Sequence, residues 1–109
     1  MRLDFADLRK ANLARLPAFG HDTVRDWTPS DWAMATTGEL GELCNLLKKR
    51  LRGEDIPQQD IAFELADTLI YLDLLAAVLD IDLAAAVIEK FNIVSVRRGI
   101  TQFVLEATQ

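Results

Sequence analysis

Residues that end helices are scarce in this chain and stand at only a few positions. The 109 residues include five glycines and three prolines. So few breaks favour long helices over many short strands. Half of the residues are hydrophobic, which predicts a packed interior rather than a disordered chain. The length suits one domain, which we expect to span residues 1–109.

Helical periodicity and capping residues divide the chain into four segments. Thr28 precedes Pro29 and Asp82 precedes an apolar run, so both are expected to cap helices. The resulting fold class is all-α, an antiparallel bundle of four main helices. The tail, residues 100–109, fits either an extended segment or a short helix. The expected helices run from about 3 to 16, 29 to 51, 57 to 79 and 83 to 98.

The charge and the single cysteine narrow the function classes. A net charge of −5 argues against a general nucleic-acid binder, which would present a basic surface. Cys44 is the one cysteine, so no intrachain disulfide is possible, and we expect it to be a small buried residue. The chain opens without a signal-peptide pattern and has no apolar run long enough to span a membrane. These features predict a soluble cytoplasmic protein that binds neither nucleic acid nor membrane.

Two pairs of carboxylates stand out on the second and third expected helices. Glu39 and Glu42 are three residues apart, as are Glu64 and Asp67, so each pair shares a helix face. If the two helices form a hairpin, the first pair lies roughly 18 and 13 Å from the turn, at 1.5 Å per residue. The second pair lies roughly 10 and 15 Å from it by the same rise. The pairs are therefore predicted to face each other.

Carboxylates among apolar neighbours repel one another and lose hydration unless they bind protons, basic side chains or cations. Mg²⁺ with oxygen ligands meets this need, with Mn²⁺ as an alternative ion. Solvated surface acids paired with lysines are the ordinary alternative. A di-iron site is disfavoured because His21, the one histidine, lies outside both pairs.

The order of these motifs resembles a known family. Glu39-Leu40-Gly41-Glu42 is followed by Glu64-Leu65-Ala66-Asp67, and later by Lys90-Phe91-Asn92. This set is similar to the MazG-like all-α nucleoside triphosphate pyrophosphohydrolases of the short, single-domain type. The resemblance covers roughly residues 27–99.

The resemblance implies a fold, a reaction and an assembly. The implied reaction is Mg²⁺-dependent cleavage of a ribo- or deoxyribonucleoside triphosphate to the monophosphate and pyrophosphate. The implied role is the removal of unwanted nucleotides from the nucleotide pool. The implied metal ligands and catalytic residues are Glu39, Glu42, Glu64 and Asp67, with one glutamate also orienting the attacking water. Homodimers or homotetramers are implied, with the substrate pocket completed near a subunit interface.

Ten further residues are candidates for substrate binding. The basic ones suit phosphates, the amides suit the base or sugar, and an aromatic ring can stack on a base. Each of them could instead have no role in function and serve as a charge at a helix end, a core residue or an exposed surface residue. Trp32 is not among the candidates, because it fits the core better than a pocket. The candidates are His21, Trp27, Asn45, Lys48, Lys49, Tyr71, Lys90, Asn92, Arg97 and Arg98.

Two other functions remain open at this point. One is a non-catalytic helical interaction module, whose sequence would be expected to have lost some of the four acids. The other is a related pyrophosphatase with a different substrate, such as dUTP or phosphoribosyl-ATP. The preferred base depends on pocket shape and a few hydrogen bonds, which the sequence alone does not define.

Overall fold

The structure is a computed structural model that describes residues 1–107. Within them it has four α-helices, two short 3₁₀ helices and no strand, which confirms the all-helical prediction. The helices are α1 (Phe5–Arg15), α2 (Pro29–Leu51), α3 (Gln58–Val78) and α4 (Leu83–Arg97), and the 3₁₀ helices are η1 (Leu16–Phe19) and η2 (Val24–Asp26). The expected bounds differ from these by one or two residues at most, where helix ends fray.

Local sequence explains where the helices begin. Thr28 accepts a hydrogen bond from the backbone N–H of Asp31, whose side chain accepts one from the Thr28 N–H in return. Asp82 caps α4 by accepting from the Ala85 N–H. After α2, Gly53 adopts a left-handed φ of 94°, which turns the chain into the α2–α3 hairpin.

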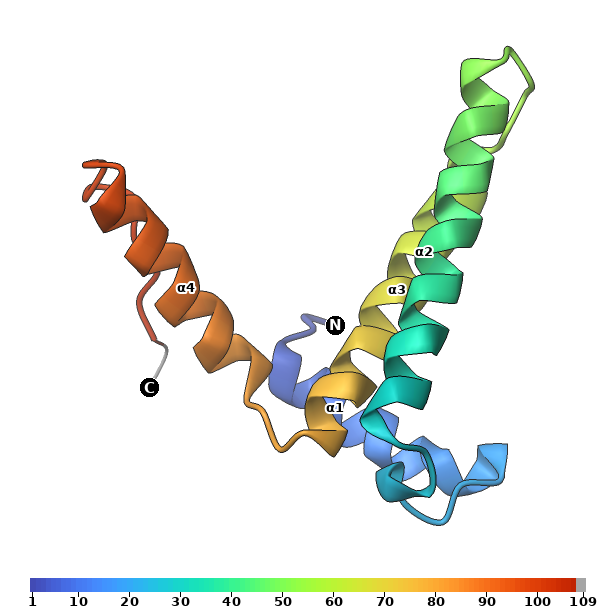
Figure 1. The fold of residues 1–109 in the computed structure, drawn as a ribbon, viewed down its shortest axis with the longest axis horizontal. Helices are drawn as coiled ribbons and strands as arrows, with labels where there is room; N and C mark the ends of the chain where they lie inside the picture. The colour runs from blue at the N-terminus through green and yellow to red at the C-terminus, as the bar shows by residue number, and fades with distance from the viewer. Residues whose placement is uncertain (108–109) are drawn as a thin grey trace.

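The core lies at the base of this hairpin. Trp32 is 1% exposed and packs with Leu16 and Leu74, and its indole N–H donates to the Val24 carbonyl at 2.9 Å. Trp32 is thus a core residue, as expected. The central helix is α3, which packs against α2 along its length and against α1 near its C-terminal end (Figure 1).

The fourth helix does not complete a closed bundle within one chain. Figure 1 shows α4 rising away from the α2–α3 hairpin, so that the molecule forms a V, and α4 packs with α1 near the vertex. The radius of gyration is 16.6 Å, whereas a compact domain of this length has about 13 Å. The predicted four helices are present, but one chain does not form the predicted four-helix antiparallel bundle, because α2 and α3 form an antiparallel hairpin and α4 extends away from it.

The tail folds back along α4 instead of forming a helix. Residues 101–102 make a turn, and 104–107 have no regular structure. The Asn92 amide pairs with the Leu105 backbone, donating to its carbonyl and accepting from its N–H, both at 2.8 Å. The part of the expected tail at 108–109 lies outside the described residues.

Candidate metal centre and aromatic pocket

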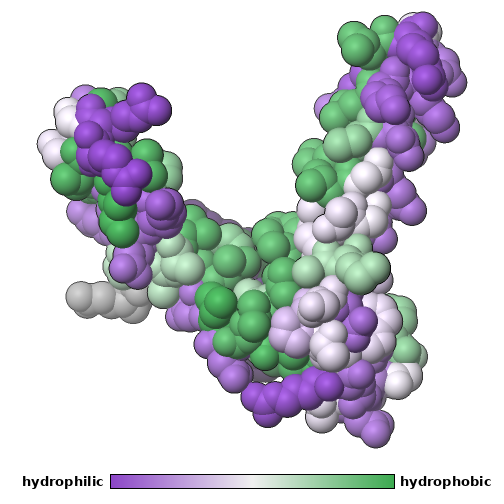
Figure 2. Space-filling view, viewed as in Figure 1, coloured by the Kyte–Doolittle hydropathy of each residue, from purple (hydrophilic) through white to green (hydrophobic). Residues whose placement is uncertain are grey.

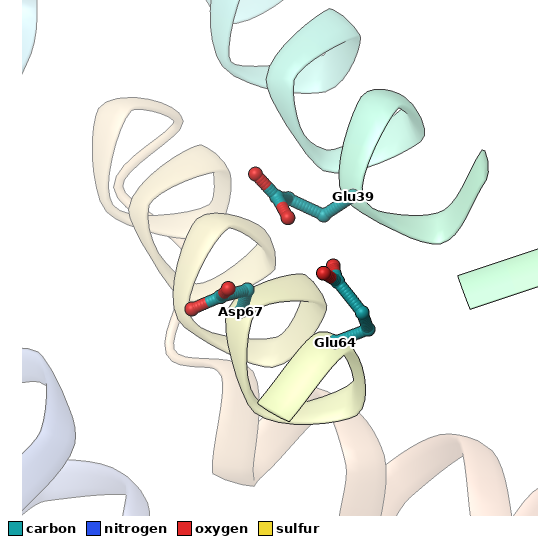
Figure 3. A group of neighbouring side chains, drawn as sticks. All are labelled: Glu39, Glu64 and Asp67. Carbon is teal, nitrogen blue, oxygen red and sulfur yellow. The ribbon is translucent and has the colours of Figure 1, made fainter. Parts of the chain in front are cut away.

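Three of the four predicted carboxylates meet between α2 and α3. Figure 3 shows Glu39 reaching from α2 toward α3, with the Glu64 carboxylate turned toward it and Asp67 one turn further along. One oxygen of each residue lies within 4.8 Å of the other two. We call Glu39, Glu64 and Asp67 the acidic cluster.

Glu42 is not part of the acidic cluster, although the sequence placed it there. It lies one turn after Glu39 on α2 and is exposed. Three residues along a helix rotate a side chain by about 300°, so two acids with this spacing share a face but point about 60° apart. Glu42 still acts on the cluster, because its charge helps to raise the pKa of Glu39.

The surroundings of the acidic cluster disfavour the negatively charged form of Glu39. The pKa of Glu39 rises from 4.5 to about 7, first through loss of hydration and then through a hydrogen bond shared with Glu64. Repulsion from the carboxylates of Glu42, Asp67 and Glu64 adds to the shift. Glu64 also holds a fully enclosed oxygen, Oε2, with no hydrogen-bond partner in the structure. Enclosed, unpartnered carboxylate oxygens are costly unless a cation binds them, and an all-oxygen set fits a hard ion such as Mg²⁺.

An aromatic pocket adjoins the acidic cluster. It has a volume of about 450 Å³, and Asp67 belongs to both the pocket wall and the cluster. The rings of His21, Trp27 and Trp32 pack against one another, with centroids 4.6 to 5.5 Å apart. Tyr71 joins Trp32 at 6.2 Å. The structure therefore brings together three of the predicted substrate residues: His21, Trp27 and Tyr71.

The other predicted substrate residues do not reach this pocket within the chain. Asn45, Lys48 and Lys49 are exposed on the second half of α2, and none of them lines the pocket. The remaining four residues lie on or just after α4, on the opposite arm of the V (Figure 1). They are Lys90, Asn92, Arg97 and Arg98, and the amide of Asn92 is already bonded to the tail.

Some residues that line the aromatic pocket were not predicted from the sequence. Asn12, Leu16 and Phe19 line the pocket from α1 and η1, before the motif region. Asn12 hydrogen-bonds to Ile70 and Asp73, which are 58 and 61 positions away, and no local pattern signals such contacts. Cys44, expected to be buried, is exposed, because Leu43 takes the buried position on α2 and the next residue points about 100° away from it.

The acidic cluster between adjacent helices and the aromatic pocket beside it agree with the resemblance to MazG-like nucleotide pyrophosphohydrolases that the sequence motifs indicate. Comparison with known proteins confirms this resemblance. The chain is similar to human dCTP pyrophosphatase 1, with 39% identity over 80 residues. The match covers 63% of this chain and 47% of the human protein, so the chain spans about half of the length of that relative. No family model matches the chain, and no solved structure gives a significant match.

One further finding concerns membranes. Among the residues that the structure describes, none of the helices is both long enough and apolar enough to cross a bilayer.

Proposed function

We propose that this chain is a Mg²⁺-dependent nucleotide pyrophosphohydrolase that cleaves nucleoside triphosphates to monophosphate and pyrophosphate. The observation that carries the proposal is the position of Asp67, which is shared by the acidic cluster and the aromatic pocket. A base held in the pocket would leave its phosphates beside the carboxylates. The similarity to a dCTP pyrophosphatase supports the same reaction and places dCTP among the first substrates to test.

The residues of the site suggest how the reaction proceeds. Glu39, Glu64 and Asp67 would hold Mg²⁺, which neutralises phosphate charge and favours attack by water. The water oxygen bonds to the α-phosphorus, and a carboxylate of the cluster accepts the water proton. The bond from the α-phosphorus to the bridging oxygen breaks, and pyrophosphate leaves with both bonding electrons. Trp27 and His21 would hold the base by stacking, which contributes about 1–3 kcal/mol per base.

We also propose that a second copy of the chain covers the open faces of the V. The accessible surface is 8150 Å², whereas a monomer of 12.2 kDa normally exposes about 6,000 Å². An excess of roughly 2,000 Å² suits an obligate interface between subunits. Exposed apolar residues recur at helical spacing on both arms, namely Leu65, Leu69 and Leu72 on α3 and Val87, Phe91 and Val94 on α4. Figure 2 shows hydrophobic residues along both arms of the V.

The test of the reaction is a panel of canonical and modified ribo- and deoxynucleoside triphosphates, including dCTP and dUTP, together with phosphoribosyl-ATP. Released pyrophosphate and orthophosphate are measured separately, with Mg²⁺ or Mn²⁺ present. We expect pyrophosphate and monophosphate in equal amounts and no orthophosphate. Orthophosphate as the only product would refute cleavage between the α- and β-phosphates. A complete lack of product would favour the non-catalytic interaction module.

The test of the assembly is the mass in solution, measured by light scattering after size exclusion. Wild-type protein is expected at a dimer or tetramer mass. Phe91→Asp should shift it toward the monomer, because a charge would enter an apolar interface. Ile93→Asp is the matched control, since Ile93 is also exposed but lies about 200° around α4 from Phe91. A wild-type monomer at micromolar concentration would contradict the second proposal.

A further inference from the structure

A buried polar network lies behind the aromatic pocket, outside every motif of the sequence. Asp73 is 1% exposed and lies in the C-terminal third of α3. The Arg9 side chain donates from Nε to Asp73 Oδ1 at 3.1 Å. The Asn12 side chain donates from Nδ2 to Asp73 Oδ2 at 3.0 Å. Both donors come from α1, so this carboxylate joins α1 to α3 while fixing the position of two side chains.

The network also fixes which way round the Asn12 amide lies. Asn12 Nδ2 donates a second hydrogen bond to the Ile70 carbonyl at 3.3 Å. A carboxylate and a backbone carbonyl both offer only acceptors. Rotating the amide by 180° would set its oxygen against these two acceptors and lose both hydrogen bonds. The nitrogen is therefore held on the side of Asp73, and the oxygen Oδ1 is held on the other side.

This fixed oxygen belongs to a residue of the pocket wall. Asn12 is 4% exposed and lines the aromatic pocket together with Trp27 and Tyr71. Among residues 1–107 no group donates a hydrogen bond to Asn12 Oδ1. The oxygen is also not sealed in, because the fully enclosed side-chain atom without a partner is Glu64 Oε2. Asn12, a residue of the pocket wall, thus carries one oriented acceptor that lacks a donor and is not fully enclosed.

We propose that Asn12 is a specificity residue that selects bases carrying an exocyclic amino group. This inference rests on the proposed function, because it assumes that the pocket takes the base of a nucleotide. An amino group on the base donates to Asn12 Oδ1. A keto oxygen in the same place sets acceptor against acceptor, and neither group is then satisfied. Asp73 acts through Asn12 and is a positioning residue.

The test is direct binding of deoxynucleoside monophosphates in the presence of Mg²⁺. Binding is measured by the quenching of tryptophan fluorescence. Two matched pairs exchange an amino group for a keto group, which also turns the adjacent ring nitrogen from an acceptor into an N–H donor: dCMP against dUMP, and dAMP against dIMP. We expect wild-type protein to bind the amino member at least about tenfold more tightly in the pair that fits the pocket. Equal affinity in both pairs, or tighter binding of the keto member, would overturn the inference.

Two variants test the residue and its orientation. Asn12→Leu removes the acceptor, so the preference within the pair should fall to about twofold or less. Asp73→Asn offers a donor to position 12, so the Asn12 amide can rotate and the preference should weaken or reverse. Asp80→Asn makes the same change in an exposed ion pair away from this pocket and should keep the wild-type preference. Circular dichroism checks that each variant keeps its helices.

Failure of this inference is distinguishable from failure of the proposed function. Pyrophosphate release without discrimination between amino and keto bases would remove the role of Asn12 and leave the enzyme activity in place. Selective binding without pyrophosphate release would remove the activity and leave the role of Asn12. If none of the four monophosphates bound, the aromatic pocket would not be a base site and the role of Asn12 would be refuted with it.

Discussion

The two arms of the V differ in what holds them and in what they carry. The α2–α3 hairpin packs along its whole length and assembles the acidic cluster within one chain. The α4 arm contacts α1 near the vertex, and with the residue after it carries the basic candidates Lys90, Arg97 and Arg98. One chain therefore contains a nearly complete acidic half of the proposed site, while three of the five basic candidates lie apart from it and the other two, Lys48 and Lys49, lie further along α2. This difference suggests that the metal centre is a property of the subunit and that the phosphate clamp is a property of the assembly.

The largest expected effect comes from the acidic cluster. Glu64→Gln or Asp67→Asn should lower pyrophosphate release at least about 100-fold, because each removes a charged ligand of the proposed metal ion. Glu42→Gln should cost less, since Glu42 lies outside the cluster. The measurement is kcat for dCTP at saturating Mg²⁺, with circular dichroism to confirm the helical fold. Full activity in Asp67→Asn would refute the metal centre, and an equal loss in Glu42→Gln would return Glu42 to the ligand set.

The next effect tests whether the α4 arm acts on the partner's acidic cluster. Glu64→Gln and Lys90→Ala proteins are each expected to be weakly active alone. The two variants are mixed in equal amounts and allowed to exchange subunits. If the assembly is a dimer, half of the dimers then contain one subunit of each variant, and each of these has one intact site out of two. The mixture should therefore regain about a quarter of the wild-type rate. Mixtures that stay as inactive as their components would show that both residues act within one subunit.

A smaller effect concerns pH and the metal ion. The pKa of Glu39 is raised to about 7 in the folded protein, so its protonated form is favoured by folding. The metal-free protein should therefore lose stability as the pH rises from about 4.5 through 7. Mg²⁺ displaces this proton, so the rise in Tm that Mg²⁺ produces should grow between pH 6 and 8. Thermal melts with and without Mg²⁺ check this, and Glu39→Gln should flatten the dependence. A rise in Tm independent of pH would exclude Glu39 from the metal centre.

The smallest effect should come from the ion pair between Arg25 and Asp80, which links the η2 region to the turn before α4. Its side chains are 71% and 77% exposed, and such a pair contributes less than about 1 kcal/mol. Arg25→Gln should therefore change the free energy of unfolding by less than about 0.5 kcal/mol in urea melts. A loss of several kcal/mol would mean that this pair, rather than the buried Arg9–Asp73 pair, holds the base of the α4 arm.

Short-range features of the molecule were predictable from the sequence, and long-range ones were not. The caps at Thr28 and Asp82 and the pairing of Glu39 with Glu64 and Asp67 follow from helical spacing and one hairpin turn. The orientation of Asn12 depends on Asp73, which is 61 positions away, and an aspartate within an apolar run gives no sign of its partner. The position of α4 could not be predicted from the sequence either. Its apolar stripe could pack equally well against the α2–α3 hairpin of the same chain or against another surface.

The double role of Asp67 has a thermodynamic consequence. If one side chain forms part of both the ion site and the pocket wall, occupation of either changes the free energy of the other. Reciprocity then requires that a nucleotide tightens Mg²⁺ binding by the same factor by which Mg²⁺ tightens nucleotide binding. A titration with the ion alone would understate the affinity that operates during turnover. At a given Mg²⁺ concentration, the fraction of the protein that holds the ion would therefore be higher with nucleotide bound than without it.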